Sequence, residues 1–362
     1  MNIAVKEKSG FITDTYWMAG LGLLAVRVIQ GFIYWGGGSR RFIYAPDKLN
    51  PEAPHWMAYK FQTAMPGALL GLEHVISFML QHFWLLYAGV IVFSAAELLA
   101  GLFLMVGLFT RISALLSMAF SVLLMLMFGW QGATCIDEWT MAACNLAMGT
   151  TLFLCGSHQY ALDNVILKKK PHLADSWVFR WCCGSLPMPV SHRGYKKLAL
   201  WLLAFVVVFD VGTYSYYRGS VVTPYHQGPV SPTTHHIALT EGKLGSDGQV
   251  NVHAYLNAGT PEAPEHIMDI WIKDANGNKL VHWDTEMLSS LPAGNFRNDY
   301  AYNKFDSGHY GIQAIVGSSA TIVLPAGTIE GGADKLPAGS LTLVMKDVEG
   351  HTFSTPLERD NG

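Results

Sequence analysis

Charged residues are scarce in this 362-residue chain, where they make up 14% of the sequence against 51% for hydrophobic residues. A soluble domain usually carries roughly 25% charged residues. Basic residues are not in excess either, since the formal net charge is −3, and nucleic-acid binding requires clustered cations that neutralise phosphates. The composition therefore argues against an ordinary soluble enzyme and against nucleic acid as a partner.

Signatures of resident cofactors are also lacking. The five cysteines include no CxxC pair, which argues against a thioredoxin-like or zinc-ribbon site. Residues 20–25 fit the dinucleotide pattern GxGxxA, but they lie inside an apolar run with no strand before it. We find no flavin or haem motif, and His226, His235 and His236 match no metal-ligand spacing. We expect no metal, so redox chemistry must use a cysteine or a diffusible carrier.

The two halves of the chain differ in charge. Residues 1–218 hold 16 Lys and Arg against 11 Asp and Glu, whereas residues 219–362 hold 8 against 16. An apolar, slightly basic part is thus followed by a polar, acidic part. We expect four segments: a four-helix membrane domain (1–167), a basic cytoplasmic linker (168–197), a transmembrane anchor (198–218) and an external β domain (219–362).

Long hydrophobic runs are abundant in the first part. A membrane span needs about 20 mostly apolar residues, and five runs qualify or nearly qualify: 16–35, 83–109, 112–128, 139–155 and 198–217. Residues 64–82 contain Pro66, Glu73 and two histidines, which favours a helix lying at the membrane surface. The first four runs predict a four-helix transmembrane bundle in contact with lipid, and the last predicts an anchor helix.

The distribution of basic residues predicts the orientation. With the N-terminus inside, the inner loops hold ten Lys and Arg, whereas the outer loops hold four: Arg40, Arg41, Lys48 and Lys60. Inner loops are normally the more basic ones. The C-terminal domain is therefore expected outside the membrane.

The C-terminal part reads as a series of short strands between turns. Alternating runs occur at 249–256, 267–273, 310–316, 321–324 and 340–346. The segment 274–278 contains Asn-Gly, which favours a hairpin turn. Many short strands without a long helix predict an immunoglobulin-like β-sandwich.

Two charged residues fall inside the predicted spans. Arg27 and Glu97 each cost about 2.5–3.5 kcal/mol or more if left alone in lipid. We expect them to face each other, with Gln30 and Tyr34 on the same helix face as Arg27. Such a pair either fixes the register of two helices or forms a polar pocket for a quinone head group.

A glycine-rich segment with two arginines follows the first span. Gly37 and Gly38 would let backbone N–H groups converge on an anion, and Arg40 and Arg41 would add guanidinium donors. Lys48 and Lys60 are further outward cations. These residues are candidates for binding an oxyanion. The alternative is a flexible turn whose arginines extend to the membrane surface.

The segment 129–141 joins two spans and contains a thiol, two carboxylates and two tryptophans. Cys135 stands just before a predicted helix start, where a thiol becomes more acidic, and it is a candidate nucleophile toward sulfur. Asp137 and Glu138 are catalytic candidates, although they would equally stabilise the helix N-terminus. Trp130 and Trp139 are candidates for lining a space near the thiol.

These motifs resemble a known pair of protein families. Residues 129–139 look like the signature of the DoxD family, and the stretches 37–46 and 107–111 are similar to the same family. Residues from about 196 to the end resemble DoxA, with the run 225–229 just after the predicted anchor. The two families are separate subunits of thiosulfate:quinone oxidoreductase, and the resemblance implies that both are fused in this chain.

The resemblance implies that two thiosulfates are coupled to tetrathionate while a diffusible quinone is reduced, in a prokaryotic inner membrane with the C-terminal domain in the periplasm. Thiosulfate would arrive at Arg40, Arg41, Lys48 and Lys60, and quinone would enter from lipid toward Arg27, Gln30, Tyr34 and Glu97. Trp130 and Trp139 would lie between them. Two alternatives remain: a non-catalytic DoxX-like scaffold that docks a redox enzyme, and a thiol oxidoreductase, which the missing CxxC disfavours. The sequence leaves the oligomeric state open.

Overall fold

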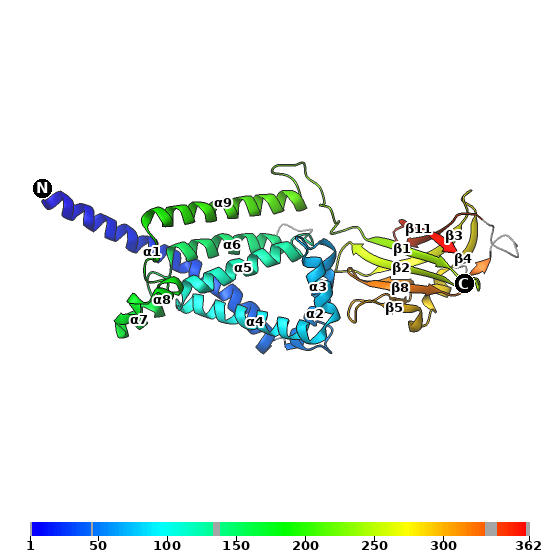
Figure 1. The fold of residues 1–362 in the computed structure, drawn as a ribbon, viewed down its shortest axis with the longest axis horizontal. Coiled ribbons are helices and arrows are strands. Elements are labelled where there is room, and N and C mark those ends of the chain that lie inside the picture. The colour runs from blue at the N-terminus through cyan, green and yellow to red at the C-terminus, as the bar shows by residue number, and fades with distance from the viewer. Residues whose placement is uncertain (1, 45, 133–137, 330–338, 360–362) are drawn as a thin grey trace. The chain divides into compact units, whose positions relative to one another are not determined.

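The computed structural model describes residues 2–44, 46–132, 138–329 and 339–359, and the side chains from residue 17 onward. The chain falls into two compact units (Figure 1). The first comprises residues 1–57 and 84–226, and the second comprises 58–83 and 227–362. The segment 58–83, which contains the residues 64–82 expected to lie along the membrane surface, thus belongs to the same unit as the C-terminal strands.

The first unit is helical. Its elements are α1 (Asn2–Ser39), a π-helical turn η1 (Arg40–Tyr44), η2 (Pro46–Leu49), α4 (Phe83–Val106), α5 (Thr110–Phe128), α6 (Glu138–Cys155), α7 (Leu162–Lys169), η4 (Pro171–Asp175), α8 (Trp177–Cys182) and α9 (His192–Tyr217).

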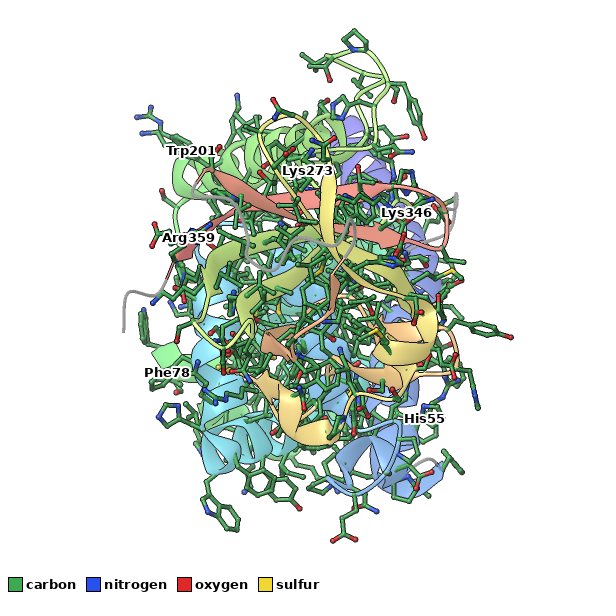
Figure 2. All side chains as sticks on the ribbon, turned by 90° about the vertical axis from the view of Figure 1, so that its right-hand side faces the viewer. His55, Phe78, Trp201, Lys273, Lys346 and Arg359 are labelled. Atoms are coloured by element: carbon green, nitrogen blue, oxygen red, sulfur yellow. The ribbon has the colours of Figure 1, made fainter. Side chains whose placement is uncertain are left out.

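Among the described residues, four helices are long and apolar enough to cross a membrane: the 17–44 part of α1 with η1, and α4, α5 and α9. The runs predicted for α4 and α5 match these helices to within about three residues, whereas α9 starts six residues before its predicted run and α1 extends beyond its predicted run at both ends. α6 is not among these four helices, so its length and composition do not identify it as a fifth membrane span. Outward-facing apolar side chains such as Trp201 on α9, labelled in Figure 2 and 75% exposed, are typical of a lipid-facing helix.

Small and apolar side chains hold the helices together. α5 and α6 pack along each other, with Met118 and Met125 of α5 against Leu146 of α6, and Val206 of α9 packs onto the same cluster. Figure 1 shows α5, α6 and α9 side by side. Ala142 and Ala143 of α6 belong to the same cluster, and small residues of this kind allow helices to approach closely where lipid provides no hydrophobic drive for association.

The second unit is built on strands. Its helices are α2 (Met57–Ala64), η3 (Met65–Gly67), α3 (Leu72–Gln81), α10 (Thr285–Ser289) and η5 (Ala293–Asn295). Its strands are β1 (His236–Leu244), β2 (Val250–Ala258), β3 (Glu265–Lys273), β4 (Lys279–Trp283), β5 (Phe296–Asn298), β6 (Asp306–Gly308), β7 (Gly311–Ala314), β8 (Ser319–Leu324), β9 (Thr328–Ile329), β10 (Leu341–Asp347) and β11 (Thr352–Arg359).

The described strands join into one 11-stranded, barrel-like sheet. Its main path runs β5-β8-β2-β1-β11-β10-β3-β4-β9. β11 pairs parallel with β1 and antiparallel with β10, and thereby connects the strands that precede it on this path to those that follow it. The predicted β-rich domain is confirmed, but an immunoglobulin-like arrangement of two separate sheets is not. β2 alternates buried and half-buried residues along its whole length, which is the pattern of a strand with one face in the core.

The predicted hairpin at 274–278 joins β3 and β4. Gly277 has φ +88°, a conformation that only glycine adopts readily. The Asp274 carboxylate accepts hydrogen bonds from the backbone N–H groups of Asn276 and Asn278. The Asn278 side-chain amide also donates to the Asp274 carboxylate, and this bond contributes most to lowering the pKa of Asp274, with the backbone bonds adding to it.

Candidate functional site

A row of hydrogen-bonded polar groups runs through the interior of the helical unit. The Gln30 amide donates to Ser117 Oγ at 3.0 Å and to the Asn145 carbonyl at 2.9 Å. The Tyr34 hydroxyl lies 2.9 Å from both the Ser117 carbonyl and Ser121 Oγ. All five residues are buried. Three helices, α1, α5 and α6, thus contact one another through hydrogen-bonded polar groups and not through apolar packing alone.

The row exists because small residues face inward along α5. Ser117 and Ser121 are four residues apart and lie on one side of the helix. The four-residue spacing of these serines is visible in the sequence, whereas their hydrogen bonds are not. Opposite it, a Cβ on Gly149 would come within 2.8 Å of Ser117 Oγ. Asn145 was missed by the sequence analysis, although a lone amide within an apolar run was the available signal.

Two acceptor atoms in this row have no partner among the described residues. They are Oε1 of Gln30 and Oδ1 of Asn145, and both atoms are shielded from solvent. The orientation of the Gln30 amide is set by its nitrogen, which donates to a backbone carbonyl. A buried acceptor left unpaired costs about 1–3 kcal/mol. The interior of the bundle therefore suits a group that brings hydrogen-bond donors.

Glu97 is neutralised by Arg41 rather than by Arg27. The Arg41 guanidinium forms an ion pair with the Glu97 carboxylate, contacts Ser94 Oγ at 3.4 Å and lies 6.0 Å from the centre of the Phe93 ring. Glu97 also interacts electrostatically with Tyr34. The polar row thus extends electrostatically from Gln30 through Tyr34 to this ion pair.

The prediction that Arg27 and Glu97 face each other is wrong. Arg27 donates to the backbone carbonyls of Ser157, Gln159 and Tyr160, which follow the end of α6. A guanidinium has five donors, and here three carbonyls and the nearby charge of Asp163 stabilise it. Arg27 therefore holds the loop at the opposite end of the bundle from Arg41.

The motif at 107–111 has a structural role at that same end. Arg111 donates to the carbonyls of Arg180, Cys183 and Leu186, and the Asp163 carboxylate accepts from the N–H groups of Phe109 and Gly184. Burial raises the pKa of the Cys183 thiol to about 11, so this cysteine stays protonated.

Gly37 and Gly38 lie within α1, so the expected glycine turn with an anion nest is wrong. A Cβ on Gly38 would lie 2.7 Å from Leu98 Cα of α4, and a Cβ on Gly101 would lie 2.1 Å from the Trp35 nitrogen. A Cβ on Gly37 would collide with the Glu97 carboxylate. These glycines let α1 and α4 approach closely enough for Arg41 to reach Glu97.

Arg41 and the segment after α5 lie at the same end of the bundle. Tyr34 pairs with Ser121, and α1 and α5 run in the same direction since Gln30 and Tyr34 contact α5 in sequence order. Arg41 follows Tyr34 by seven residues, and Phe128, the end of α5, follows Ser121 by seven. Both therefore lie about 10 Å further along parallel helices.

The end of α9 holds the start of the 129–141 segment. Arg218 donates to the Gly132 carbonyl at 2.9 Å, Tyr217 to the Met125 carbonyl at 3.0 Å, and the Trp139 indole to Thr213 at 2.9 Å. Trp130 is buried, and Glu138 opens α6. Cys135 and Asp137 lie outside the described residues.

The four outward cations are divided between the two units. Arg40, Arg41 and Lys48 belong to the helical unit, where Arg40 is exposed and Lys48 is near enough to Glu97 to interact with it electrostatically. Lys60 is exposed on α2 of the second unit. Arg40 is thus the arginine whose guanidinium is open to an incoming anion.

A buried histidine–carboxylate pair stabilises the strand unit. His235 Nδ1 lies 2.9 Å from the Glu265 carboxylate, and Nε2 lies 3.1 Å from the Thr260 carbonyl. Burial alone would lower the pKa of His235, but the Glu265 hydrogen bond and charge outweigh it, so the pKa is raised. Among the described residues, we find no group of three His, Cys, Asp or Glu side chains that could hold a metal.

Comparison with known families agrees with this division of the chain. Residues 23–188 match the family described as the TQO small subunit DoxD, and residues 217–355 match the TQO small subunit DoxA. The chain is a fused DoxD–DoxA protein. These families are thiosulfate:quinone oxidoreductase (TQO) subunits, and they imply thiosulfate as substrate and quinone as electron acceptor.

One solved structure was also compared with this DoxD–DoxA chain. The Pseudomonas fluorescens alkylpurine DNA glycosylase AlkC, bound to DNA containing an abasic site analog, is 12% identical. The match covers 93% of this chain and 99% of that chain with a TM-score of 0.22. A TM-score this low does not indicate a shared fold.

Proposed function

We propose that this chain is a membrane thiosulfate:quinone oxidoreductase that joins two thiosulfates into tetrathionate and passes two electrons to one quinone. The observation that carries the proposal is the buried polar row from Gln30 to Glu97 inside a bundle of the DoxD family. Polar groups in a membrane interior are costly and usually functional. A scaffold that only docks another enzyme would not need them.

The polar row is the proposed binding place of the quinone head group. Gln30 and Asn145 offer unpaired acceptors to the hydroxyl groups of the reduced product. Quinone reduction takes up two protons, and the hydroxyl groups of Tyr34 and Ser121 lie in hydrogen-bonded sequence at 2.9 Å, while the Ser117 hydroxyl accepts from the Gln30 amide. Such a sequence can relay a proton toward the head group. Arg27, which the sequence suggested for the quinone site, is not included in it, because its guanidinium donates hydrogen bonds to three backbone carbonyls.

Thiosulfate is proposed to bind at the Arg41 end of the bundle. Two dianions repel each other, so their approach requires cations. Arg40 is exposed there, whereas Arg41 balances Glu97 and sets the charge beneath the surface. Lys48 and Lys60 remain proposed contributors to the positive charge that attracts thiosulfate. Gly37 and Gly38 contribute to the site indirectly, by allowing α1 and α4 to pack closely.

The proposed sulfur chemistry passes through Cys135. The Cys135 sulfur forms an S–S bond with the outer sulfur of one thiosulfate as two electrons pass to the quinone. The second thiosulfate then attacks that outer sulfur, which releases tetrathionate and returns the cysteine thiolate. Asp137 and Glu138 are proposed to accept the thiol proton, and Trp130 and Trp139 to enclose the site.

Chain connectivity supports a topology with five spans. The segment 58–83 precedes α4 and the strands follow α9, yet both belong to one compact unit and so lie on the same side of the membrane. Crossings by α4, α5 and α9 alone would place them on opposite sides. α6 has 18 residues, about 27 Å of helix, and would supply the fourth crossing. Together with the positive-inside rule, this topology supports the proposal that the strand unit lies outside, in the periplasm.

The test is turnover by the purified chain alone. Under anaerobic conditions, we expect thiosulfate and a short-chain quinone to give one tetrathionate and one quinol for every two thiosulfates consumed. Failure of the purified, folded chain to reduce quinone would favour the scaffold. A Cys135→Ser variant tests the covalent route, with Cys144→Ser as the matched control, because Cys144 is an exposed cysteine on α6. Full activity of Cys135→Ser would remove that route.

A further inference from the structure

The segment 58–83, which contains α2, η3 and α3, connects two helices of the DoxD region but packs with the DoxA strands. It lies inside the DoxD match, whereas the strands lie inside the DoxA match. Both nevertheless form one compact unit, in which η3 contacts β2. We call residues 58–83 the docking segment.

The centre of this contact is a fully buried glutamine. The Gln62 amide nitrogen donates to the carbonyls of Asn303 and Gly317 at 2.8 and 2.9 Å, and Gln62 Oε1 accepts from the Asn303 N–H at 2.9 Å. Every hydrogen-bonding group of the Gln62 carboxamide is directed at the strand unit. The Asn303 amide returns a bond to the Tyr59 carbonyl at 3.1 Å.

Further contacts extend this interface on both sides. The Ser77 hydroxyl on α3 lies 2.8 Å from the Tyr300 hydroxyl, and the rings of Tyr59 and Tyr302 meet edge to face at 5.9 Å. Gly317 has φ +87°, and a Cβ there would lie 2.0 Å from the Gln62 carbonyl. The backbone at Gly317 is therefore shaped to admit the docking segment.

We propose that the docking segment is the binding surface of the DoxD region for a DoxA-type domain, and that it holds the two regions together without the covalent connection between α9 and β1. The partner is a strand domain that presents a loop like 300–303 and a glycine like Gly317. Fusion then tethers two proteins that already associate. The proposal does not depend on the enzymatic activity.

The chemistry of the contact favours one specific partner. Buried polar groups must be paired, so a surface that presents a buried carboxamide accepts only a domain that supplies two carbonyls and one N–H in matching positions. Each buried group left unpaired weakens an association roughly five- to hundredfold. An apolar contact would not discriminate in this way.

The experiment uses the full chain with a protease site inserted between His226 and Gln227, both of which are exposed. Membranes containing the protein are cleaved, washed with high salt and centrifuged, and the C-terminal fragment is measured in pellet and supernatant. We expect the fragment to stay in the pellet. In Gln62→Leu we expect its release to become at least tenfold faster, and in Tyr300→Phe we expect a smaller increase.

Gln81→Leu is the matched control, because it makes the same change at an exposed position of the docking segment. It should retain the fragment like the unsubstituted chain. Immediate release from the unsubstituted chain would overturn the proposal. Equal retention in Gln62→Leu, Tyr300→Phe and the control would also overturn it, because lipid adsorption or other contacts would then hold the fragment.

Discussion

The ion pair between Arg41 and Glu97 can be tested by a double-mutant cycle. The two side chains are only 16% and 12% exposed, so bulk water compensates each charge only in part. Breaking a buried pair by removing one partner costs about 3–5 kcal/mol, because the other charge is left behind. We expect Arg41→Met and Glu97→Met each to lower the free energy of unfolding by about this amount.

The double variant should be less damaged than either single one. Replacing a buried pair by apolar residues of similar volume is often neutral, so the coupling energy should be about 3 kcal/mol or more. Unfolding in mixed micelles, followed by the fluorescence of the buried tryptophans, gives the four free energies. If the two single effects add within roughly 0.5 kcal/mol, the side chains do not form the pair described here.

Three further predictions follow from individual contacts. Arg40→Ala should raise the apparent KM for thiosulfate and make it more sensitive to salt, with kcat little changed; an unchanged KM would remove Arg40 from the binding site. Gly38→Ala should destabilise the bundle by roughly 1–3 kcal/mol through overpacking, whereas Gly36→Ala, with no atom near its added Cβ, should be harmless in thermal unfolding. Because the pKa of His235 is raised, its pairing with Glu265 stabilises the strand unit fully below pH about 6.5 and is lost as the pH rises through the raised value. Protease resistance of the strand unit should therefore fall at higher pH, and His235→Gln should flatten that dependence.

The helices and strands were largely predictable because they depend on local patterns. The apolar runs marked α4, α5, α6 and α9, and α6 ends at Cys155 as expected. The alternating runs marked β2, β3, β7, β8 and β10, and the Asn-Gly turn was predicted where Gly277 has positive φ. Periodicity and turn chemistry act over a few residues, so the sequence alone carries them.

The pairing of charges was not predictable in the same way. Arg27 and Glu97 looked like partners because both fall near the middle of their runs, but α1 is long enough for Arg27 to lie at one end of the bundle. The three glycines looked like a turn, yet they continue the helix, and α4 packs against two of them, Gly37 and Gly38. Helix depth and rotation depend on contacts between distant segments, which local patterns do not report. The same holds for the docking segment, whose hydrogen bonds join residues about 240 positions apart.

Sealed vesicles that hold the chain and a lipid-soluble quinone test the central claim most directly. Thiosulfate crosses lipid poorly, so it can be supplied on one side only, and protease digestion reports on which side the strand unit lies. The proposed topology predicts quinone reduction only when thiosulfate is on the side of the strand unit. Quinone reduction driven by thiosulfate on the opposite side would contradict it.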